Sequence, residues 1–252
     1  MKNLQNLILI GFLSLLFSCN STSDKPGYFN LLPQPQQFEI KGVSSLKYND
    51  IQNYYSIKEI ALPVRGELLT GIVSIEKQSK AQIVFKIDGS IDLPNEGYLL
   101  EISSKQITIV GKDEAGLFYA FMTLEQLMVD AKEQNVNLPL CNIRDYPALS
   151  YRAIHLDVKH HLEKTDYYYK LIDRLASYKV NGIIAEMEDK IKYKRQPGVG
   201  SADALSIDEW KKLSSYAKER NIEVSPLIQG LGHASFVLKH NVCDVICVKL
   251  AY

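Results

Sequence analysis

Polar side chains follow three expected strands in the second half of the chain, at the point where each strand ends. They are Asp157 and Lys159 after the first strand, Glu186 and Glu188 after the second, and Gln229 after the third. Because the carboxyl ends of parallel strands meet at one edge of a sheet, these side chains should lie close together. Carboxylates gathered in this way can transfer protons or bind hydroxyl groups. The pattern favours sugar chemistry over acyl transfer, and the sequence contains no Gly-x-Ser-x-Gly motif.

Glu186 is the carboxylate among these whose burial would cost most. It follows residues 183–185, an apolar stretch that should be buried on both faces of a parallel sheet. A carboxylate there needs a partner to offset its desolvation, and Lys159 is the nearest candidate. Taken singly, each of these charges could instead be a solvated residue at the sheet edge. His155 shares a strand face with Asp157, and we expect a hydrogen-bonded histidine of the core.

The remaining histidines and cysteines do not predict a metal site. Four side chains could be considered as a metal-binding cluster: His155, Asp157, His160 and His161. The first two share a strand face, but the other two lie in the following loop. Cys243 and Cys247 lack a second Cys or His pair at zinc spacing. His233 differs, because it follows the third strand beside Gly232, where a flexible backbone lets an imidazole reach into a cleft. We expect no metal site.

Short strands and helices alternate from residue 148 on, and these elements must position the polar residues. We expect strands at 153–157, 182–187 and 223–229, and a helix over 168–176 with one apolar face. A second helix opens at Ser206, whose partner Glu209 three residues later forms a capping-box signature. Such alternation implies a parallel α/β sheet, either doubly wound or the start of a (β/α)8 TIM barrel. No Gly-rich nucleotide-binding motif occurs, which favours the barrel.

A smaller α/β domain is expected upstream, over residues 28–147. Alternating apolar residues predict strands at 81–87, 98–102 and 106–111, the last two forming a hairpin. From Asp113, apolar residues at helical spacing predict a covering helix, in the order Leu117, Ala120, Phe121, Leu124 and Met128. Pro147 restrains its predecessor to extended geometry, so we place the boundary there and the second domain at 148–252.

The N-terminus has the features of a bacterial export signal. Lys2 precedes a short apolar run, and Leu16-Phe17-Ser18-Cys19 resembles a lipobox, in which the cysteine is lipidated and becomes the first mature residue. We therefore expect a signal peptide at 1–18, a lipidated tether at 19–27, and a protein anchored by lipid in the cell envelope, in the periplasm or at the surface. A plain secretory peptide is the alternative. The cysteines after Cys19 are three and irregularly spaced, so no disulfide scaffold is implied.

The charge balance argues against nucleic-acid binding. The chain has 29 Lys and Arg and 29 Asp and Glu, which gives a formal net charge of zero. Nucleic-acid binding depends on clustered cations that neutralise phosphates. We expect no nucleic-acid partner.

Several stretches together resemble glycoside hydrolase family 20, and most closely its hexosaminidase D-like branch. They are Tyr151 to Lys159, residues 175–182, Glu186-Met-Glu188-Asp189, and Pro226 to His233. Residues 32–36 and 114–120 are similar to the small α/β domain that precedes the barrel in that family. The order and spacing of the motifs extend the resemblance over about residues 30 to 240.

The resemblance implies an exo-acting β-N-acetylhexosaminidase that removes terminal N-acetylglucosamine or N-acetylgalactosamine from glycans without a cofactor. In that family's substrate-assisted mechanism, the substrate's acetamido oxygen attacks the anomeric carbon, and a Glu acts as general acid and base. Asp189 and His233 look like the pair that supports this Glu. The sugar-binding end would be lined by Asp157, Lys159, Glu186, Glu188 and Gln229.

Two departures from the family pattern bear on activity. His160 stands where most of the family has a sugar-binding Arg, and no Asp-Glu pair occurs beyond residue 223 to carry the chemistry. The two Asp-Glu pairs, at 113–114 and 208–209, begin expected helices. Residues 150–252 are also fewer than the roughly 250 of a full barrel. We therefore expect a C-terminally truncated, inactive hexosaminidase; the alternatives are a non-catalytic carbohydrate-binding or vestigial protein, and a different barrel hydrolase.

Overall fold

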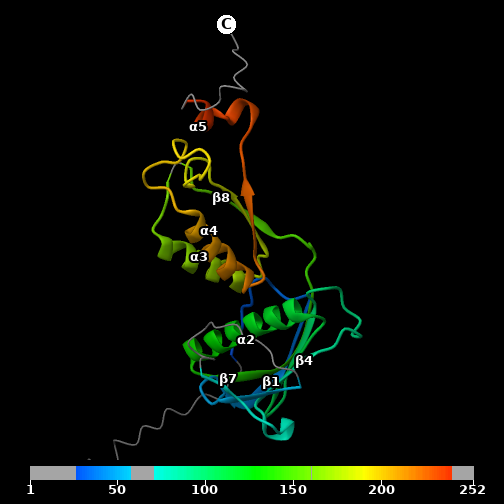
Figure 1. The fold of residues 1–252 in the computed structure, drawn as a ribbon. Coiled ribbons are helices and arrows are strands. Elements are labelled where there is room, and N and C mark those ends of the chain that lie inside the picture. The colour runs from blue at the N-terminus through cyan, green and yellow to red at the C-terminus, as the bar shows by residue number, and fades with distance from the viewer. Residues whose placement is uncertain (1–26, 58–70, 160, 240–252) are drawn as a thin grey trace, which may run out of the picture.

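The computed structural model describes residues 27–57, 71–159 and 161–239. The expectations for the signal segment, for Cys19, His160, Cys243 and Cys247 lie outside these residues. Within the described ranges, two sheets are stacked along the molecule with helices between and beside them (Figure 1). No helix in these ranges is both long and apolar enough to cross a membrane.

The first unit is built on a mixed sheet in the order β1-β7-β5-β6-β4-β2-β3. Its strands are β1 (Gln37–Lys47), β2 (Asn53–Ser56), β3 (Val73–Ser74), β4 (Ile83–Ile87), β5 (Tyr98–Ile102), β6 (Ile107–Gly111) and β7 (Asn137–Asp145), with a short 3-10 helix η1 (Gln78–Lys80) before β4. The expected hairpin is confirmed, since β5 and β6 pair antiparallel. β1 and β7 were not expected, and they pair with each other at the edge of the sheet.

Helix α2 (Glu114–Gln134) covers one face of this sheet. Asp113 caps it, accepting a hydrogen bond of 2.8 Å from the Gly116 N–H, and Asn135 ends it in the left-handed conformation. The expected apolar face is buried, but so is every residue from Gly116 to Leu124. The helix is buried all round here because the sheet lies on one side and the second unit on the other (Figure 1).

The second unit consists of three parallel strands and their connecting helices. Its elements are β8 (Ala153–Asp157), α3 (Thr165–Ser177), β9 (Gly182–Glu186), α4 (Ile207–Lys218) and β10 (Glu223–Leu227), followed by η2 (Leu231–His233) and α5 (Ser235–Leu238). The strand order is β10-β9-β8. The capping box is present: the Ser206 hydroxyl accepts from the Glu209 N–H, and the Glu209 carboxylate accepts from the Ser206 N–H.

The two connecting helices of the second unit, α3 and α4, lie on one face of its sheet. Side chains from all three strands and both helices meet there, including Ile183 of β9, Tyr168 of α3 and Trp210 of α4. A doubly wound sheet places helices on both faces, whereas consecutive strand order with helices on one face is the winding of a β/α barrel. The described strands and helices are therefore arranged as in a segment of a β/α barrel.

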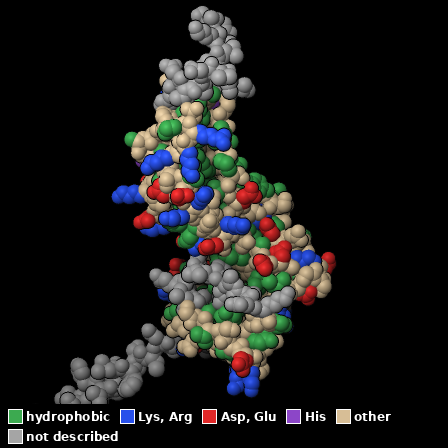
Figure 2. Space-filling view, viewed as in Figure 1, with side chains coloured by type: hydrophobic (Ala, Val, Ile, Leu, Met, Phe, Trp, Pro, Cys, Tyr) green, Lys and Arg blue, Asp and Glu red, His purple; other side chains and the backbone are tan. Residues whose placement is uncertain are grey.

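The outward side of α3 and α4 is a solvated surface. Figure 2 shows Lys and Arg side chains beside Asp and Glu side chains on this face. Lys211 and Asp208 are an example, with 3.8 Å between charged atoms and side chains 71% and 84% exposed. Exposed ion pairs of this kind contribute little to stability.

Candidate functional site

Glu186 lies at the centre of a polar cluster where the three parallel strands end. Its Oε1 accepts hydrogen bonds from Lys159 Nζ at 2.5 Å and from Gln229 Nε2 at 2.6 Å, and its Oε2 lies 2.8 Å from His155 Nε2. The carboxylate side chain is only 2% exposed. The expected pairing of Glu186 with Lys159 is confirmed.

The register of the sheet explains why these residues meet. Glu186 is aligned with Asp157 of β8 on one side and with Leu227 of β10 on the other. Lys159 and Gln229 each lie two residues beyond the aligned position, so each can turn back over the strand end from its own side. Asp157 adds a second carboxylate, whose Oδ2 is 3.2 Å from Lys159 Nζ.

The electrostatics of the cluster keep both partners charged. The hydrogen bonds from Lys159 and Gln229 lower the pKa of Glu186 from 4.5 to about 2, against the opposing effect of burial. The bond to Glu186 likewise raises the pKa of Lys159, again against the effect of burial. At neutral pH the cluster therefore contains an ionised carboxylate and an ammonium group that are bonded to each other, and the side chains of Lys159 and Asp157 are 19% and 36% exposed.

His155 is hydrogen-bonded as expected, but its placement in the core was wrong. Its side chain is 52% exposed. β8 is an edge strand of the small sheet, and among the described residues the helices cover the other face. The imidazole therefore lies open on the polar face beside Glu186. Sequence reasoning did not count His155 among the site residues, although its spacing from Asp157 already placed both on one strand face.

Among the described residues, no hydrogen bond or ion pair joins Glu188, Asp189 or His233 to this cluster. Glu188 adopts the left-handed conformation with φ of 40°, and its carbonyl oxygen accepts from the Tyr193 hydroxyl at 2.6 Å. Asp189 Oδ1 lies 3.7 Å from Lys190 Nζ. His233 is exposed in η2. Between the described atoms of Asp189 and His233 there is no hydrogen bond or ion pair, so their supporting role stays a prediction.

Lys190 has a structural role that the sequence did not indicate. Its ammonium group is 3.1 Å from Asp203 and 3.2 Å from Ser201, and its carbonyl oxygen accepts from the Trp210 indole at 3.1 Å. The side chain is 11% exposed. These contacts tie the loop after β9 to the start of α4. The partners are distant in the sequence, so spacing alone gave no signal for them.

The comparisons with known proteins find similarity to one family of glycoside hydrolases. The family model described as glycosyl hydrolase family 20, domain 2 matches residues 28–146. A beta-hexosaminidase from Porphyromonas gingivalis is 27% identical over 241 residues, which cover 83% of this chain and 31% of that protein. Residues 28–146 thus match domain 2 of glycoside hydrolase family 20, and the chain is similar to enzymes of that family beyond this range. The chain spans about a third of the length of that relative.

Other family 20 proteins are similar over shorter stretches or in fold. Hexosaminidase D from Bos taurus is 36% identical over 90 residues, covering 35% of this chain and 26% of that protein. The crystal structure of a beta-N-acetylhexosaminidase from Bacteroides fragilis NCTC 9343 superposes with a TM-score of 0.70 at 24% identity, over 83% of this chain and 47% of that one. The structure of the family 20 beta-N-acetylhexosaminidase from Streptomyces coelicolor A3(2) superposes with a TM-score of 0.71 at 19% identity, over 86% of this chain and 50% of that one. These structures share the fold of both units.

Both Asp-Glu pairs of this chain stabilise helix starts. Asp113 is the N-cap of α2, and Glu209 completes the capping box of α4. Their oxygens are engaged with backbone N–H groups, which is the usual task of acidic residues at these positions. Neither pair contributes to the cluster around Glu186. In the described ranges, no group of three His, Cys, Asp or Glu side chains could hold a metal ion.

Proposed function

We propose that this chain carries part of the sugar-binding site of an exo-acting β-N-acetylhexosaminidase, and that Glu186 is its central acceptor. The observation that carries the proposal is the ionised, buried carboxylate of Glu186 held by Lys159 and Gln229 at the ends of three parallel strands. Similarity to beta-hexosaminidases supports the proposed substrate class, namely glycans with terminal N-acetylglucosamine or N-acetylgalactosamine.

The chemistry of the cluster is that of a binding site. A carboxyl group with a pKa of about 2 holds almost no proton at neutral pH, so Glu186 cannot serve as a general acid there. It can accept hydrogen bonds from sugar hydroxyl groups, while Lys159 donates to a hydroxyl oxygen. Glu188 is proposed to line the same end of the site. In the substrate-assisted reaction that we propose for the whole enzyme, these groups would orient the sugar.

A second candidate function is non-catalytic carbohydrate binding. It is favoured by a specific observation: both Asp-Glu pairs of the sequence cap helices and so do not supply the acid that hydrolysis needs. Under this interpretation the cluster around Glu186 binds a sugar that the chain does not cleave.

Binding and hydrolysis measured on the same preparation test the proposed site and the non-catalytic candidate. We expect the 252-residue chain to bind N-acetylglucosamine in calorimetry, and Glu186→Gln to weaken binding about tenfold or more, since a charged hydrogen-bond acceptor is lost. Glu101→Gln, on the exposed side of β5, is the matched control and should bind normally. Equal binding by Glu186→Gln and Glu101→Gln would contradict the proposed site.

Hydrolysis of 4-nitrophenyl N-acetylglucosaminide should stay at the buffer rate for this chain. Release of 4-nitrophenol above that rate would rule out the non-catalytic candidate and require an acid among these residues. Glycan binding by residues 28–147 alone would instead assign the binding function to the first unit, which we call the accessory domain.

We also propose that the protein is exported and anchored by lipid at Cys19. The mass of the protein isolated from its native cells tests this. We expect the loss of residues 1–18 and the addition of a diacylglycerol group, and loss of the lipid mass in Cys19→Ser. Retention of the full N-terminus would contradict export through this segment.

A further inference from the structure

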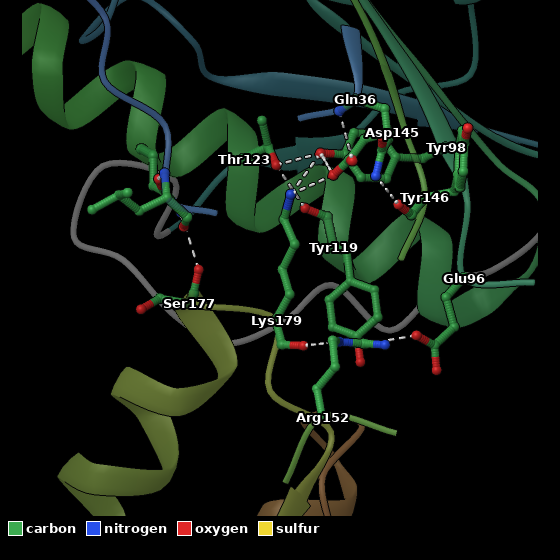
Figure 3. Close-up of polar contacts among 12 residues, drawn as sticks. Gln36, Glu96, Tyr98, Tyr119, Thr123, Asp145, Tyr146, Arg152, Ser177 and Lys179 are labelled. Atoms are coloured by element: carbon green, nitrogen blue, oxygen red, sulfur yellow. Dashed lines mark hydrogen bonds and ion pairs between the residues drawn. The ribbon is translucent and has the colours of Figure 1, made fainter. Parts of the chain in front are cut away.

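A buried ion pair joins the two units of the fold at their junction (Figure 3). Lys179 Nζ, from the segment after α3, lies 2.7 Å from Asp145 Oδ2 at the end of β7, and the two side chains are 8% and 10% exposed. The same ammonium donates to the Tyr98 hydroxyl at 2.9 Å. Tyr98 in turn bonds Asp145 at 2.9 Å and the Thr123 hydroxyl of α2 at 2.6 Å.

A second ion pair lies next to the first. Arg152 Nη2 contacts Glu96 Oε2 at 2.6 Å, and Arg152 Nε donates to the Lys179 carbonyl oxygen at 2.7 Å. Asn181 links both sides, donating to Glu96 at 3.2 Å and accepting from the Arg152 N–H at 2.7 Å. We call this set the junction network; its members are Glu96, Tyr98, Asp145, Arg152, Lys179 and Asn181.

The network connects strand ends on both sides of the junction. Tyr98 begins β5, and Asp145, its register partner, ends the neighbouring strand β7. Arg152 immediately precedes β8, while Lys179 and Asn181 precede β9. Two adjacent strands of the large sheet are therefore bonded to the amino ends of two adjacent strands of the small sheet. This arrangement restrains rotation of one unit against the other more than a single contact would.

The backbone at two of these residues is unfavourable for their type. Lys179 has φ of 60° and Glu96 has φ of 65°, in the left-handed region that glycine and asparagine adopt most readily. Lys179 follows the end of α3, the place where glycine most often stands. At both positions the contact across the junction offsets a local conformational cost.

We propose that the junction network is a lock that makes the accessory domain and the strands of the second unit fold and unfold together. Neither unit on its own could neutralise the buried charges, because Lys179 belongs to one and Asp145 to the other. Burial lowers the pKa of Lys179 and Asp145 opposes that effect, so the charge of the ammonium depends on the partner across the junction. The lock is independent of the proposed sugar binding, which takes place at the opposite ends of the same strands.

The test compares unfolding of the two units within the intact chain. Trp210 is the one tryptophan of the sequence and lies in α4, so its fluorescence follows the second unit. Hydrogen exchange of peptides from β5 and β6, measured by mass spectrometry, follows the accessory domain. In the unaltered chain we expect both to change at the same temperature. Two separate transitions would overturn the proposal.

Lys179→Met removes the ammonium group and keeps most of the side-chain length. We expect the Trp210 transition to fall by about 10 °C and to separate from that of the accessory domain. Asp145 keeps hydrogen bonds from the Gln36 N–H at 3.2 Å and the Tyr98 hydroxyl at 2.9 Å, so the accessory domain should change less. Lys211→Met, at a surface ion pair, is the control and should leave both transitions in place.

Glu96→Gln gives a second, milder variant. It preserves side-chain shape, removes the charge facing Arg152, and should lower the Trp210 transition by a few degrees with the same separation. If Lys179→Met does not fold, Glu96→Gln tests the proposal in its place. Transitions that stay coincident in every variant that folds would show that the network does not hold the units together.

Discussion

Glu186 illustrates how one residue can be anticipated in part from sequence. The stretch before it predicted burial, and burial of a carboxylate predicted a cationic partner, which is Lys159. The contribution of Gln229 follows from its position two residues beyond the aligned strand end. The exposure of His155 could not be predicted, because it depends on which elements cover that face of the sheet.

The lowered pKa of Glu186 makes the stability of the protein sensitive to acid. Its pKa lies below its ordinary value of 4.5, at about 2, so the carboxylate stabilises the folded state fully above about pH 4.5. That contribution is lost as the pH falls from there towards 2. We expect urea unfolding, followed by Trp210 fluorescence, to show a steeper loss of stability over this range than Glu186→Gln shows. Parallel curves for the two proteins would contradict the pKa.

At the scale of elements, the regular strands and helices were predictable and the irregular ones were not. The expected strand at 153–157 is β8, and the expected capping box begins α4. β7 was missed because Pro139 interrupts its pattern, and β1 because register shifts on either side of Gly42 and Val43 break its alternation. Pairing with neighbouring strands, rather than local preference, stabilises these two strands.

The capping box of α4 gives a prediction for a single hydroxyl group. Ser206→Ala leaves the Glu209 N–H without its acceptor and should lower the free energy of unfolding by about 1 kcal/mol. Ser215→Ala, at an exposed position within the same helix, should have little effect or stabilise slightly, since alanine favours helix. Urea unfolding of the two variants measures the difference. Equal stability would mean that the cap contributes nothing.

The first turn of α2 approaches the turn before β5 very closely. A β-carbon on Gly116 would lie 2.2 Å from the Gly97 carbonyl oxygen, a backbone atom that cannot move aside alone. We expect Gly116→Ala to destabilise the protein by about 1–3 kcal/mol through overpacking. Gly89→Ala is the matched control, because no atom lies within 4 Å of the added carbon. Thermal unfolding with similar midpoints for both would contradict this close contact.

At the scale of the whole molecule, the sequence left two windings open and the strand order decides between them. The order β10-β9-β8 with helices on one face is that of a barrel segment. The way the two units meet was not foreseen. Lys179 and Asp145 are 34 residues apart and no periodic pattern connects them, so only the folded chain brings them together.

The accessory domain should be less stable when it is separated from the second unit. Residues 28–147 expressed alone would expose the side of α2 that carries Tyr119 and Thr123, and leave Asp145 without its lysine. We expect a lower unfolding temperature than for the same residues within the full chain, and binding of the dye ANS. Differential scanning fluorimetry and ANS emission measure both. Equal stability would indicate that the interface contributes little.

The burial of α2 on two sides also determines where this protein could be recombined with its relatives. A crossover at the linker near Pro147 would leave α2 facing a foreign second unit, although its residues from Gly116 to Leu124 already fit the native one. Chimaeras should therefore exchange the outward residues of α2 together with the second unit. The boundary between exchangeable parts of the protein therefore follows the surface of this helix rather than the linker in the sequence.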